Sequence, residues 1–222
     1  MLKKTYQHFR KCAILFVNDV GGKSPDFDAT YRRKGPKMKY AYCNGKILNG
    51  TKDMQVQEGL CILTDGGKIA DIVLKEQVPA EYEAVDLAGK YIMPGLINMH
   101  VHLAGSGKPP KKQRDNEKLV RNLMGTALSR AVAYKVVSGF AKTELMSGVT
   151  TIRTVGGLGD FDTRLRDEIK AGKTGPRILA ANQGISVPGG HMAGSVAVAA
   201  KNNEEALAHL AQAEKEKVDL VK

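Results

Sequence analysis

The feature that most constrains this chain is a regular alternation, from residue 91 onward, of short apolar segments with longer helix-like segments. The apolar segments are rich in β-branched residues, as is typical of strands buried on both faces of a parallel sheet. We expect strands at 91–103, 148–155, 177–181 and 218–221, separated by helices at 117–145, 161–171 and 203–217. This alternation favours a parallel sheet with right-handed crossovers. Four such strands are half of a closed (β/α)8 barrel, which needs about 250 residues.

Residues 38–90 are patterned differently and predict a small β-sandwich-like domain. Asn44 and Gly45 tolerate the positive φ angles of a type I′ turn, and Asp65-Gly66-Gly67 suggests a second tight turn. The expected hairpins join 40–43 to 46–48, and 59–63 to 68–74. The predicted fold class is therefore α/β: the first half of a TIM-type barrel in residues 91–222, preceded by a small β domain.

Residues 1–37 are a basic segment that we expect to be either disordered or upstream sequence that is not native, with the native start at Met38. Much of the net charge of +11 lies here, because residues 1–39 hold ten Lys and Arg against three Asp. The rest of the chain is nearly balanced and aromatic residues are scarce, so nucleic acid is not an expected partner. No apolar run reaches the ~18 residues of a membrane span, so a membrane is not expected either.

Three cysteines, Cys12, Cys43 and Cys61, are an odd number without C-x-x-C spacing. This pattern argues against a disulfide framework and against a structural zinc knuckle. The chain also lacks the long apolar stretch of a secretory leader. We therefore expect a cytoplasmic protein with reduced thiols.

His100 and His102 end the first expected barrel strand. Residues two apart on a strand point to the same face, and barrel enzymes place their sites at this carboxyl edge. Two imidazoles at a fixed separation suit a divalent ion such as zinc. The plainer interpretation, a pair of hydrogen-bonded or exposed histidines, stays open because two ligands do not complete a zinc shell.

The segment that carries these histidines, Met93-Pro-Gly-Leu-Ile-Asn-Met-His-Val-His102, resembles the opening of the amidohydrolase superfamily, whose barrels begin with Pro-Gly-Leu-Ile-Asp-x-His-x-His. Three further motifs are similar to its imidazolonepropionase-related branch, which includes metal-dependent prolidase-type dipeptidases. They are Gly148-Val-Thr-Thr-Ile-Arg153, Gly175-Pro-Arg-Ile178 and Pro188-Gly-Gly-His191. The resemblance spans roughly residues 38–222. Asn98 departs from the pattern, because the family usually has Asp there.

The resemblance implies a hydrolase of amide or peptide C–N bonds with one or two divalent metal ions. Zinc is the expected ion, although manganese, iron and cobalt stay open. His100 and His102 would bind the more buried metal, and Lys222, modified to a carbamate, would bridge both. A free ammonium cannot ligate a cation, whereas a carbamate offers two anionic oxygens. The plainer interpretation of Lys222 is a solvated, frayed chain end.

Two loops are candidates for contact with a substrate. The resemblance implies a substrate-binding role for His191, which follows two glycines after the third strand; holding backbone carbonyls is the alternative. The loop after the histidine pair is either a solvated loop or a lid that attracts a carboxylate-bearing substrate. Its cations are Lys108, Lys111, Lys112 and Arg114. The glycines at 156–159 predict a βα turn rather than a phosphate cradle.

The proton-relay carboxylate and two further histidines would come from later strands that this chain does not contain, so the catalytic residues are unknown. The favoured function is a metal-dependent hydrolase of a dipeptide-like or cyclic amide substrate, represented by its metal-binding N-terminal half and inactive alone. The alternative is a non-catalytic half-barrel that acts as an assembly partner. Exposed strand edges would favour a homo-oligomer or pairing with a complementing C-terminal half.

Overall fold

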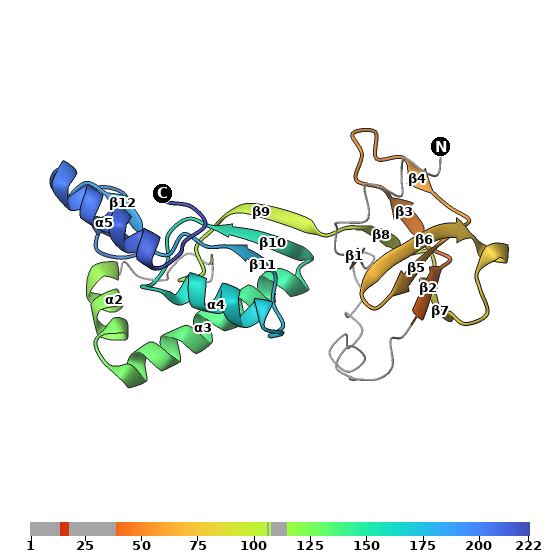
Figure 1. Ribbon diagram of the computed structural model, residues 1–222, viewed down its shortest axis with the longest axis horizontal. Helices are drawn as coiled ribbons and strands as arrows, with labels where there is room; N and C mark the ends of the chain where they lie inside the picture. The colour runs from red at the N-terminus through yellow and green to blue at the C-terminus, as the bar shows by residue number, and fades with distance from the viewer. Residues whose placement is uncertain (1–13, 18–38, 106, 108–114) are drawn as a thin grey trace. The chain divides into compact units, whose positions relative to one another are not determined.

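The computed structural model describes residues 14–17, 39–105, 107 and 115–222. It contains two compact units, Met1–Gly95 and Leu96–Lys222 (Figure 1). The apolar run expected to be one strand at 91–103 is two strands, β8 (Tyr91–Pro94) and β9 (Leu96–Val101), on either side of Gly95. β8 pairs within a sheet of the first unit. The division between units therefore falls after β8 rather than before it.

The first unit is a small β-sandwich of two four-stranded sheets, ordered β1-β8-β3-β4 and β6-β5-β2-β7 (Figure 1). Besides β8, the elements are β1 (Ile14–Val17), β2 (Lys39–Cys43), β3 (Lys46–Leu48), β4 (Val56–Gln57), β5 (Leu60–Asp65), β6 (Lys68–Leu74), the 3-10 helix η1 (Lys75–Gln77) and β7 (Glu83–Asp86). Ile47 and Ile92 from one sheet share a buried cluster with Ile62 and Ile72 from the other. This shared core confirms the predicted sandwich-like β domain.

Of the two expected hairpins, one is confirmed and one is wrong. β5 and β6 pair antiparallel through Gly66 and Gly67, whose φ angles are 57° and 80°. β2 and β3, in contrast, lie in different sheets, so Asn44 and Gly45 carry the chain from one sheet to the other. A side chain on Gly45 would collide with the buried side chain of Leu87. The glycine therefore serves close packing between the sheets rather than a tight turn.

The interpretation of the cysteines is corrected by a disulfide. Cys43 of β2 lies opposite Cys61 of the antiparallel strand β5, with Cα atoms 4.4 Å apart, and their sulfur atoms are bonded. Sequence spacing did not reveal the pair because sheet register, not a local motif, brings the two residues together. Disulfides persist mainly in oxidising compartments. The pairing therefore removes the cysteine-based argument for a cytoplasmic location; Cys12 lies outside the described residues.

Within the basic segment 1–37, the described residues are those of β1. This strand pairs antiparallel with β8 and lies at the edge of its sheet. Part of the segment therefore contributes to the first unit. The rest of the segment, together with Met38, lies outside the described residues, and the expected start at Met38 stays a prediction.

The second unit contains a parallel three-stranded sheet ordered β11-β10-β9, with helices packed against it (Figure 1). After β9 the elements are α2 (Asn116–Met124), α3 (Ala127–Met146), β10 (Val149–Thr154), α4 (Phe161–Lys170), β11 (Arg177–Leu179), β12 (Gly184–Ser186), β13 (Ala197–Ala199) and α5 (Asn203–Lys215). Helical segments connect the parallel strands, as right-handed crossovers require. The predicted alternation is confirmed for β9, β10 and β11, whereas the short parallel pair β12–β13 was not predicted.

The single helix expected at 117–145 is two helices. α2 ends at Gly125, and Thr126 caps the N-terminus of α3. Ser129 donates its backbone N–H to Thr126 Oγ1 at 3.1 Å, while the Thr126 N–H donates to Ser129 Oγ at 3.2 Å. This reciprocal capping box satisfies two donors that a helix start leaves free. A glycine followed by a threonine was thus the sequence signal for the break.

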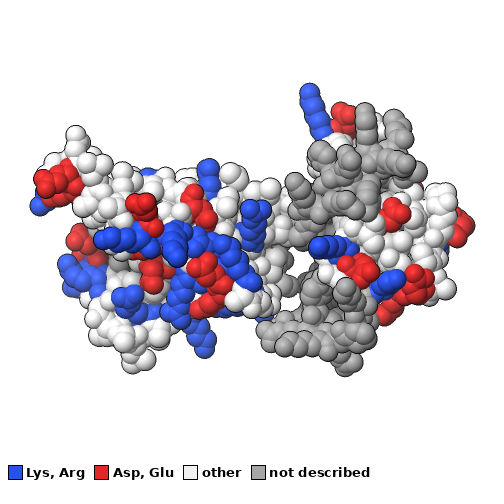
Figure 2. Space-filling view, in the orientation of Figure 1, with Lys and Arg blue, Asp and Glu red and all other residues white. Residues whose placement is uncertain are grey.

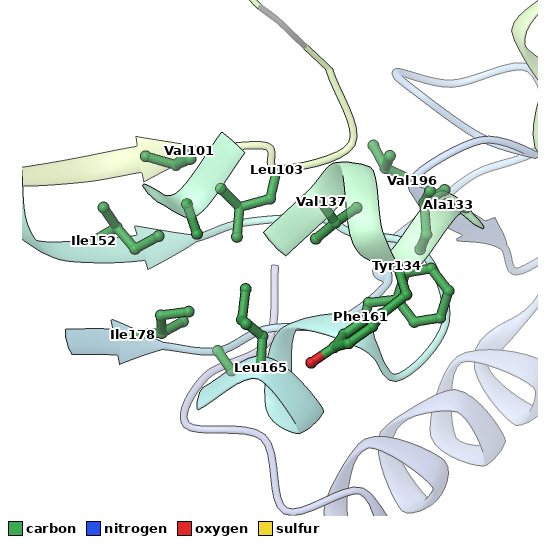
Figure 3. Close-up of a cluster of buried hydrophobic side chains, with 13 residues drawn as sticks. Val101, Leu103, Ala133, Tyr134, Val137, Ile152, Phe161, Leu165, Ile178 and Val196 are labelled. Carbon is green, nitrogen blue, oxygen red and sulfur yellow. The ribbon is translucent and has the colours of Figure 1, made fainter. Parts of the chain in front are cut away.

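Figure 3 shows the core of the second unit, where the sheet meets α3 and α4. Ile152 of β10 and Ile178 of β11 share one buried cluster with Leu165 of α4. In the same cluster Phe161 of α4 lies edge-on to Tyr134 of α3, with ring centroids 5.2 Å apart. Burying each such side chain contributes about 1.5–3 kcal/mol. Apolar burial therefore holds both helices on one face of the sheet.

The fourth barrel strand, expected at 218–221, is not formed. The Asp219 N–H donates to the Ala180 carbonyl at 2.7 Å, and the Lys222 carbonyl accepts from the Ile185 N–H at 2.8 Å. A ladder needs repeated bonds with one neighbouring strand. Here the two bonds go to residues of different segments, so the end of the chain is held in place without strand pairing.

Candidate metal centre

His100 and His102 lie at the carboxyl end of β9, and the structure brings their rings together. Their Nε2 atoms are 3.3 Å apart, and the ring planes are inclined by 62°. The alternation of side chains along a strand places both imidazoles on one face. His100 is exposed and His102 is half-buried. The pair therefore lies at an accessible edge of the sheet.

One ring nitrogen of His102 forms a hydrogen bond with the backbone. Its Nδ1 lies 3.0 Å from the carbonyl oxygen of Gly156, in the turn after β10. A carbonyl only accepts hydrogen bonds, so Nδ1 carries the proton and Nε2 of the neutral ring keeps its lone pair. Burial lowers the pKa of His102, against the opposing effect of the Gly156 hydrogen bond. The positive charges of Lys222, His100 and His191 lower this pKa further.

The histidine pair fits a tetrahedral cation. Two nitrogen ligands bound about 2.0–2.1 Å from a tetrahedral ion lie roughly 3.3 Å apart. The Nε2 atoms of His100 and His102 have that separation, and the free Nε2 of His102 is the form that binds a metal. Within the described ranges, no group of three or more His, Cys, Asp and Glu side chains could hold a metal ion. The pair alone does not complete a tetrahedral shell, and its role as a ligand set stays a prediction.

The backbone around β12 connects Lys222 to the turn after β10. The Lys222 carbonyl accepts from the Ile185 N–H, and the neighbouring Gly184 N–H donates to the Val196 carbonyl at 3.0 Å. A Cβ added to Gly156 would lie 3.1 Å from the same Val196 oxygen. Four parts of the chain, at Gly156, Gly184–Ile185, Val196 and Lys222, thus meet beside the histidine pair.

His191 lies in the exposed loop between β12 and β13. Its charge and that of Lys222 both act on the pKa of His102, so both residues lie within electrostatic reach of the pair. His100 and His102 are thus in direct contact, whereas Lys222 and His191 act on His102 only through longer-range electrostatics. Their roles as ligands or substrate contacts stay predictions.

Asn98, which departs from the family pattern, supports the strand locally. Its Oδ1 accepts a hydrogen bond from the backbone N–H of His100 at 3.2 Å. A carboxylate could accept the same bond, so the change from Asp removes a negative charge but keeps this contact. The cations of the predicted lid, Lys108, Lys111, Lys112 and Arg114, lie outside the described residues.

Gly156 contacts the histidine pair, which sequence reasoning did not predict. Its φ is +132°, a conformation that residues with side chains rarely adopt, and a Cβ would lie 3.2 Å from the His102 ring. The glycines after β10 predict a turn, and the turn is present between β10 and α4. The role of its carbonyl depends on how β9 and β10 are aligned, which no local pattern reveals.

Comparisons with known sequences point to one family. The sequence profile described as the Amidohydrolase family matches residues 91–221, more than half of the chain. The dihydroorotase of Bacillus cytotoxicus is 39% identical over 80 residues, which cover 34% of this chain and 17% of that protein. The dihydroorotase of Geotalea daltonii is 35% identical over 63 residues, 28% of this chain and 14% of that protein. The matched region thus spans less than a fifth of these relatives.

Solved structures agree on the fold. A protein of Bifidobacterium longum assigned as a prolidase has a TM-score of 0.61 and 33% identity, covering 82% of this chain and 40% of that chain. A Xaa-Pro dipeptidase with bound methionine in its active site has a TM-score of 0.59 and 26% identity, covering 82% of this chain and 46% of that chain. The similarity therefore covers less than half of each neighbour. The chain belongs to the amidohydrolase family and forms the N-terminal part of its TIM-type barrel.

Proposed function

We propose that this chain is the metal-binding part of a metal-dependent hydrolase that cleaves C–N bonds in small amides. The observation that carries the proposal is the pair of Nε2 atoms 3.3 Å apart on His100 and His102, with the tautomer of His102 set by a backbone carbonyl. The likeness to dihydroorotases and to prolidase-type dipeptidases supports this reaction class. A dipeptide-like or cyclic amide is the substrate that we propose.

Each residue of the site has a distinct task. His100 and His102 hold a divalent ion, with zinc as the first choice, and the Gly156 carbonyl keeps His102 in the ligating tautomer. A bound ion supplies Lewis acidity, which polarises the scissile carbonyl and activates water. Lys222, as a carbamate, would supply anionic oxygens to the bound metal, and His191 would contact the substrate. The reaction also needs a carboxylate that relays a proton to the leaving nitrogen, and no described residue is assigned to that task.

Exposed apolar residues of the second unit support a partner for this half of the barrel. On β9, an edge strand of the described sheet, Leu96, Ile97 and Met99 are 45%, 63% and 48% exposed. On α3, Leu128 and Val132 are 78% and 55% exposed. Unpaired edges and apolar faces favour association. We propose that a complementing C-terminal half covers them, with pairing of two copies as the alternative occupant and a non-catalytic assembly role as the alternative function.

The surface charge of the second unit favours a small substrate over nucleic acid. Figure 2 shows Lys and Arg side chains beside Asp and Glu on the visible face of this unit. Ion pairs in this unit include those of Lys173 and Arg164 with Glu168. Proteins that bind nucleic acid instead carry a continuous basic stripe or patch. Among the described helices, none is long and apolar enough to cross a membrane.

The zinc content of variants tests the proposed function. We expect the purified chain to retain about one zinc ion. His100→Ala should weaken zinc binding by more than about 100-fold, because losing even an outer-shell partner costs 10–100-fold. His209→Ala is the matched control, since it removes a histidine from α5 and leaves the pair intact. Zinc retained by His100→Ala at the wild-type level, measured by elemental analysis after dialysis, would contradict the proposal.

A further inference from the structure

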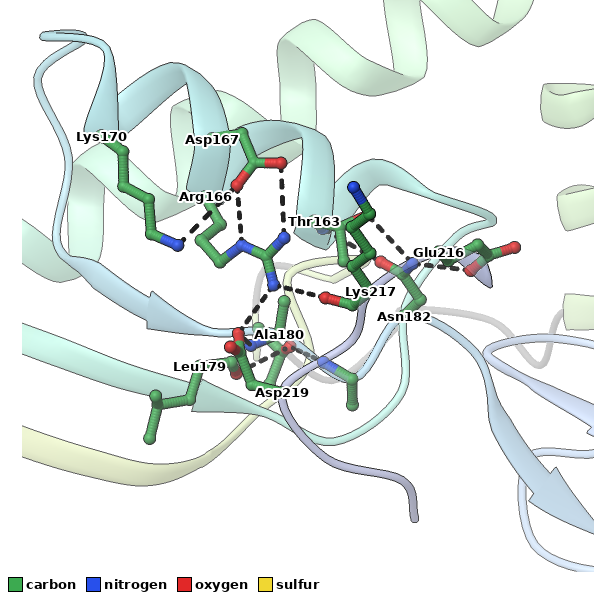
Figure 4. A network of polar contacts seen from close by, with 12 residues as sticks. Thr163, Arg166, Asp167, Lys170, Leu179, Ala180, Asn182, Glu216, Lys217 and Asp219 are labelled. Carbon is green, nitrogen blue, oxygen red and sulfur yellow. Dashed lines mark hydrogen bonds and ion pairs between the residues drawn. The ribbon is translucent and has the colours of Figure 1, made fainter. Parts of the chain in front are cut away.

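Arg166, in the middle of α4, is the centre of a polar network that reaches the chain just after α5 (Figure 4). Its side chain is only 7% exposed. Nη1 donates to the Lys217 carbonyl at 2.8 Å and to Asp219 Oδ2 at 2.9 Å. Nε donates to Asp167 Oδ1 at 2.8 Å. One guanidinium therefore holds acceptors on three residues, and two of these residues precede Lys222 by only a few positions.

Asp219 is held from a second side by the chain that continues β11. Its Oδ2 accepts the Ala180 N–H at 2.8 Å, and its own N–H donates to the Ala180 carbonyl at 2.7 Å. Burial raises the pKa of Asp219, but the hydrogen bonds from Ala180 and Arg166 outweigh this effect and lower it. The ionised carboxylate thus links the guanidinium of α4 to the backbone beyond β11.

An independent contact ties the end of α5 to the same helix. Asn182, which is 1% exposed, donates from Nδ2 to Thr163 Oγ1 at 3.0 Å and to Glu216 Oε2 at 2.7 Å. Its Oδ1 accepts from the Thr163 N–H at 3.0 Å. α4 therefore fixes both the last turn of α5 and the residues that follow it (Figure 4).

The Arg166 network lies only three residues from Lys222 along the chain. Lys222 follows Asp219 by three residues, and its carbonyl accepts from the Ile185 N–H. The neighbouring Gly184 N–H donates to the Val196 carbonyl, which lies beside Gly156 and the His102 ring. One residue of extended chain spans about 3.3–3.6 Å. A slip by one residue at Asp219 would therefore move Lys222 by more than the length of a metal–ligand bond.

We propose that Arg166 is a positioning residue that fixes the segment Lys217–Lys222 against β11 and so places Lys222 beside His100 and His102. The inference rests on the proposed metal site and extends it to a residue of α4 that touches neither metal nor substrate. A guanidinium suits this task because its fork of donors holds several acceptors in one plane, whereas a lysine ammonium is a single point charge.

Amide hydrogen exchange tests the placement without any metal. Arg166→Met is expected to speed exchange of the Ile185 N–H, which is bonded to the Lys222 carbonyl, by about 10-fold or more. The Gly184 N–H, bonded elsewhere, should exchange as in the wild type. Arg164→Met is the matched control, since it removes an exposed guanidinium from the same helix. Unchanged exchange at Ile185 in folded Arg166→Met would overturn the inference.

Zinc affinity in the presence of bicarbonate tests whether Arg166 acts through Lys222. Arg166→Met and Lys222→Met should each weaken zinc binding by about 10–100-fold, the size of an outer-shell loss. The double variant should bind no more weakly than Lys222→Met alone. A merely structural role would weaken binding equally in both backgrounds, and that result would overturn the inference.

Two further variants test the role of Arg166 if Arg166→Met does not fold. If Arg166→Met does not fold, Asp219→Asn removes the charge that the guanidinium binds while leaving an oxygen for Ala180, and the same exchange and affinity changes are expected. In Arg166→Lys, hydrogen exchange at Ile185 and zinc affinity should return only part of the way to their wild-type values. Failure of the proposed function is a separate result, because it appears as zinc retained by His100→Ala, whatever Arg166 does.

Discussion

Replacing Phe161 with alanine is expected to lower the free energy of unfolding of the second unit by about 3–5 kcal/mol. Phe161 begins α4, is 2% exposed and packs edge-on against Tyr134 of α3. Alanine would remove the ring from the cluster that holds both helices on the sheet. The cost combines the lost transfer of apolar atoms from water with the cavity left among neighbours that only partly relax.

Urea unfolding followed by far-ultraviolet circular dichroism measures this change. Leu128→Ala on α3 is the control, because its side chain is 78% exposed and truncation should alter the free energy of unfolding by no more than about 0.5 kcal/mol. If Phe161→Ala cost less than about 1 kcal/mol, the cluster would not be what holds α4 to the sheet.

Replacing Asp162, the next residue, is expected to raise the free energy of unfolding, in contrast to the loss at Phe161. Its side chain is 1% exposed, and neither carboxylate oxygen has a hydrogen-bond partner among the described residues. Burial raises the pKa of Asp162 from 3.8 to about 6, although the nearby Thr154 hydroxyl and Asn182 backbone oppose the shift. Because the pKa is higher in the folded state, protonation stabilises the fold. That stability is complete below about pH 3.8 and is lost as the pH rises through about 6.

Asp162→Asn is therefore expected to raise the free energy of unfolding by roughly 2–3 kcal/mol at pH 8, where the wild type buries a charge. At pH 4 the difference should nearly vanish, since the folded wild type is then protonated. Urea titrations between pH 4 and pH 8 measure both values. The control is Asp160→Asn, which removes an exposed carboxylate paired with Arg130 and should change the free energy of unfolding by no more than about 1 kcal/mol. A profile for Asp162→Asn that falls as steeply as the wild-type profile would refute the assignment.

Sequence patterns predicted the parts of the fold that neighbouring residues determine. The helix at α4, the turn at Gly66 and Gly67 and the alternation of β10, α4 and β11 depend on periodicity and turn chemistry within a few residues. The disulfide of Cys43 with Cys61 and the passage of the chain between sheets at Asn44 were not predicted. Both depend on which strands become neighbours, a property of the tertiary structure that no local pattern contains.

In the candidate site, too, only the features set by neighbouring residues were predicted. Strand alternation alone predicted that His100 and His102 share a face. The partner of His102 is a carbonyl 54 residues away in the sequence, and Asp219 lies 53 residues from Arg166. These contacts connect separate βα units, so they exist only once the sheet has assembled. Residues that orient a site are harder to predict than ligands because their role depends on remote backbone.

The boundary after Gly95 is the position at which the protein can be cut into its two units. A fragment that starts at Tyr91, where the family profile begins, would carry β8 away from β1 and β3. Ile92, which is 1% exposed in the intact chain, would then lose the sandwich around it, and the truncated sandwich would retain a gap in the middle of its sheet. A cut between Gly95 and Leu96 leaves each sheet whole, so grafts or exchanges of the amino-terminal sandwich between relatives should use that junction.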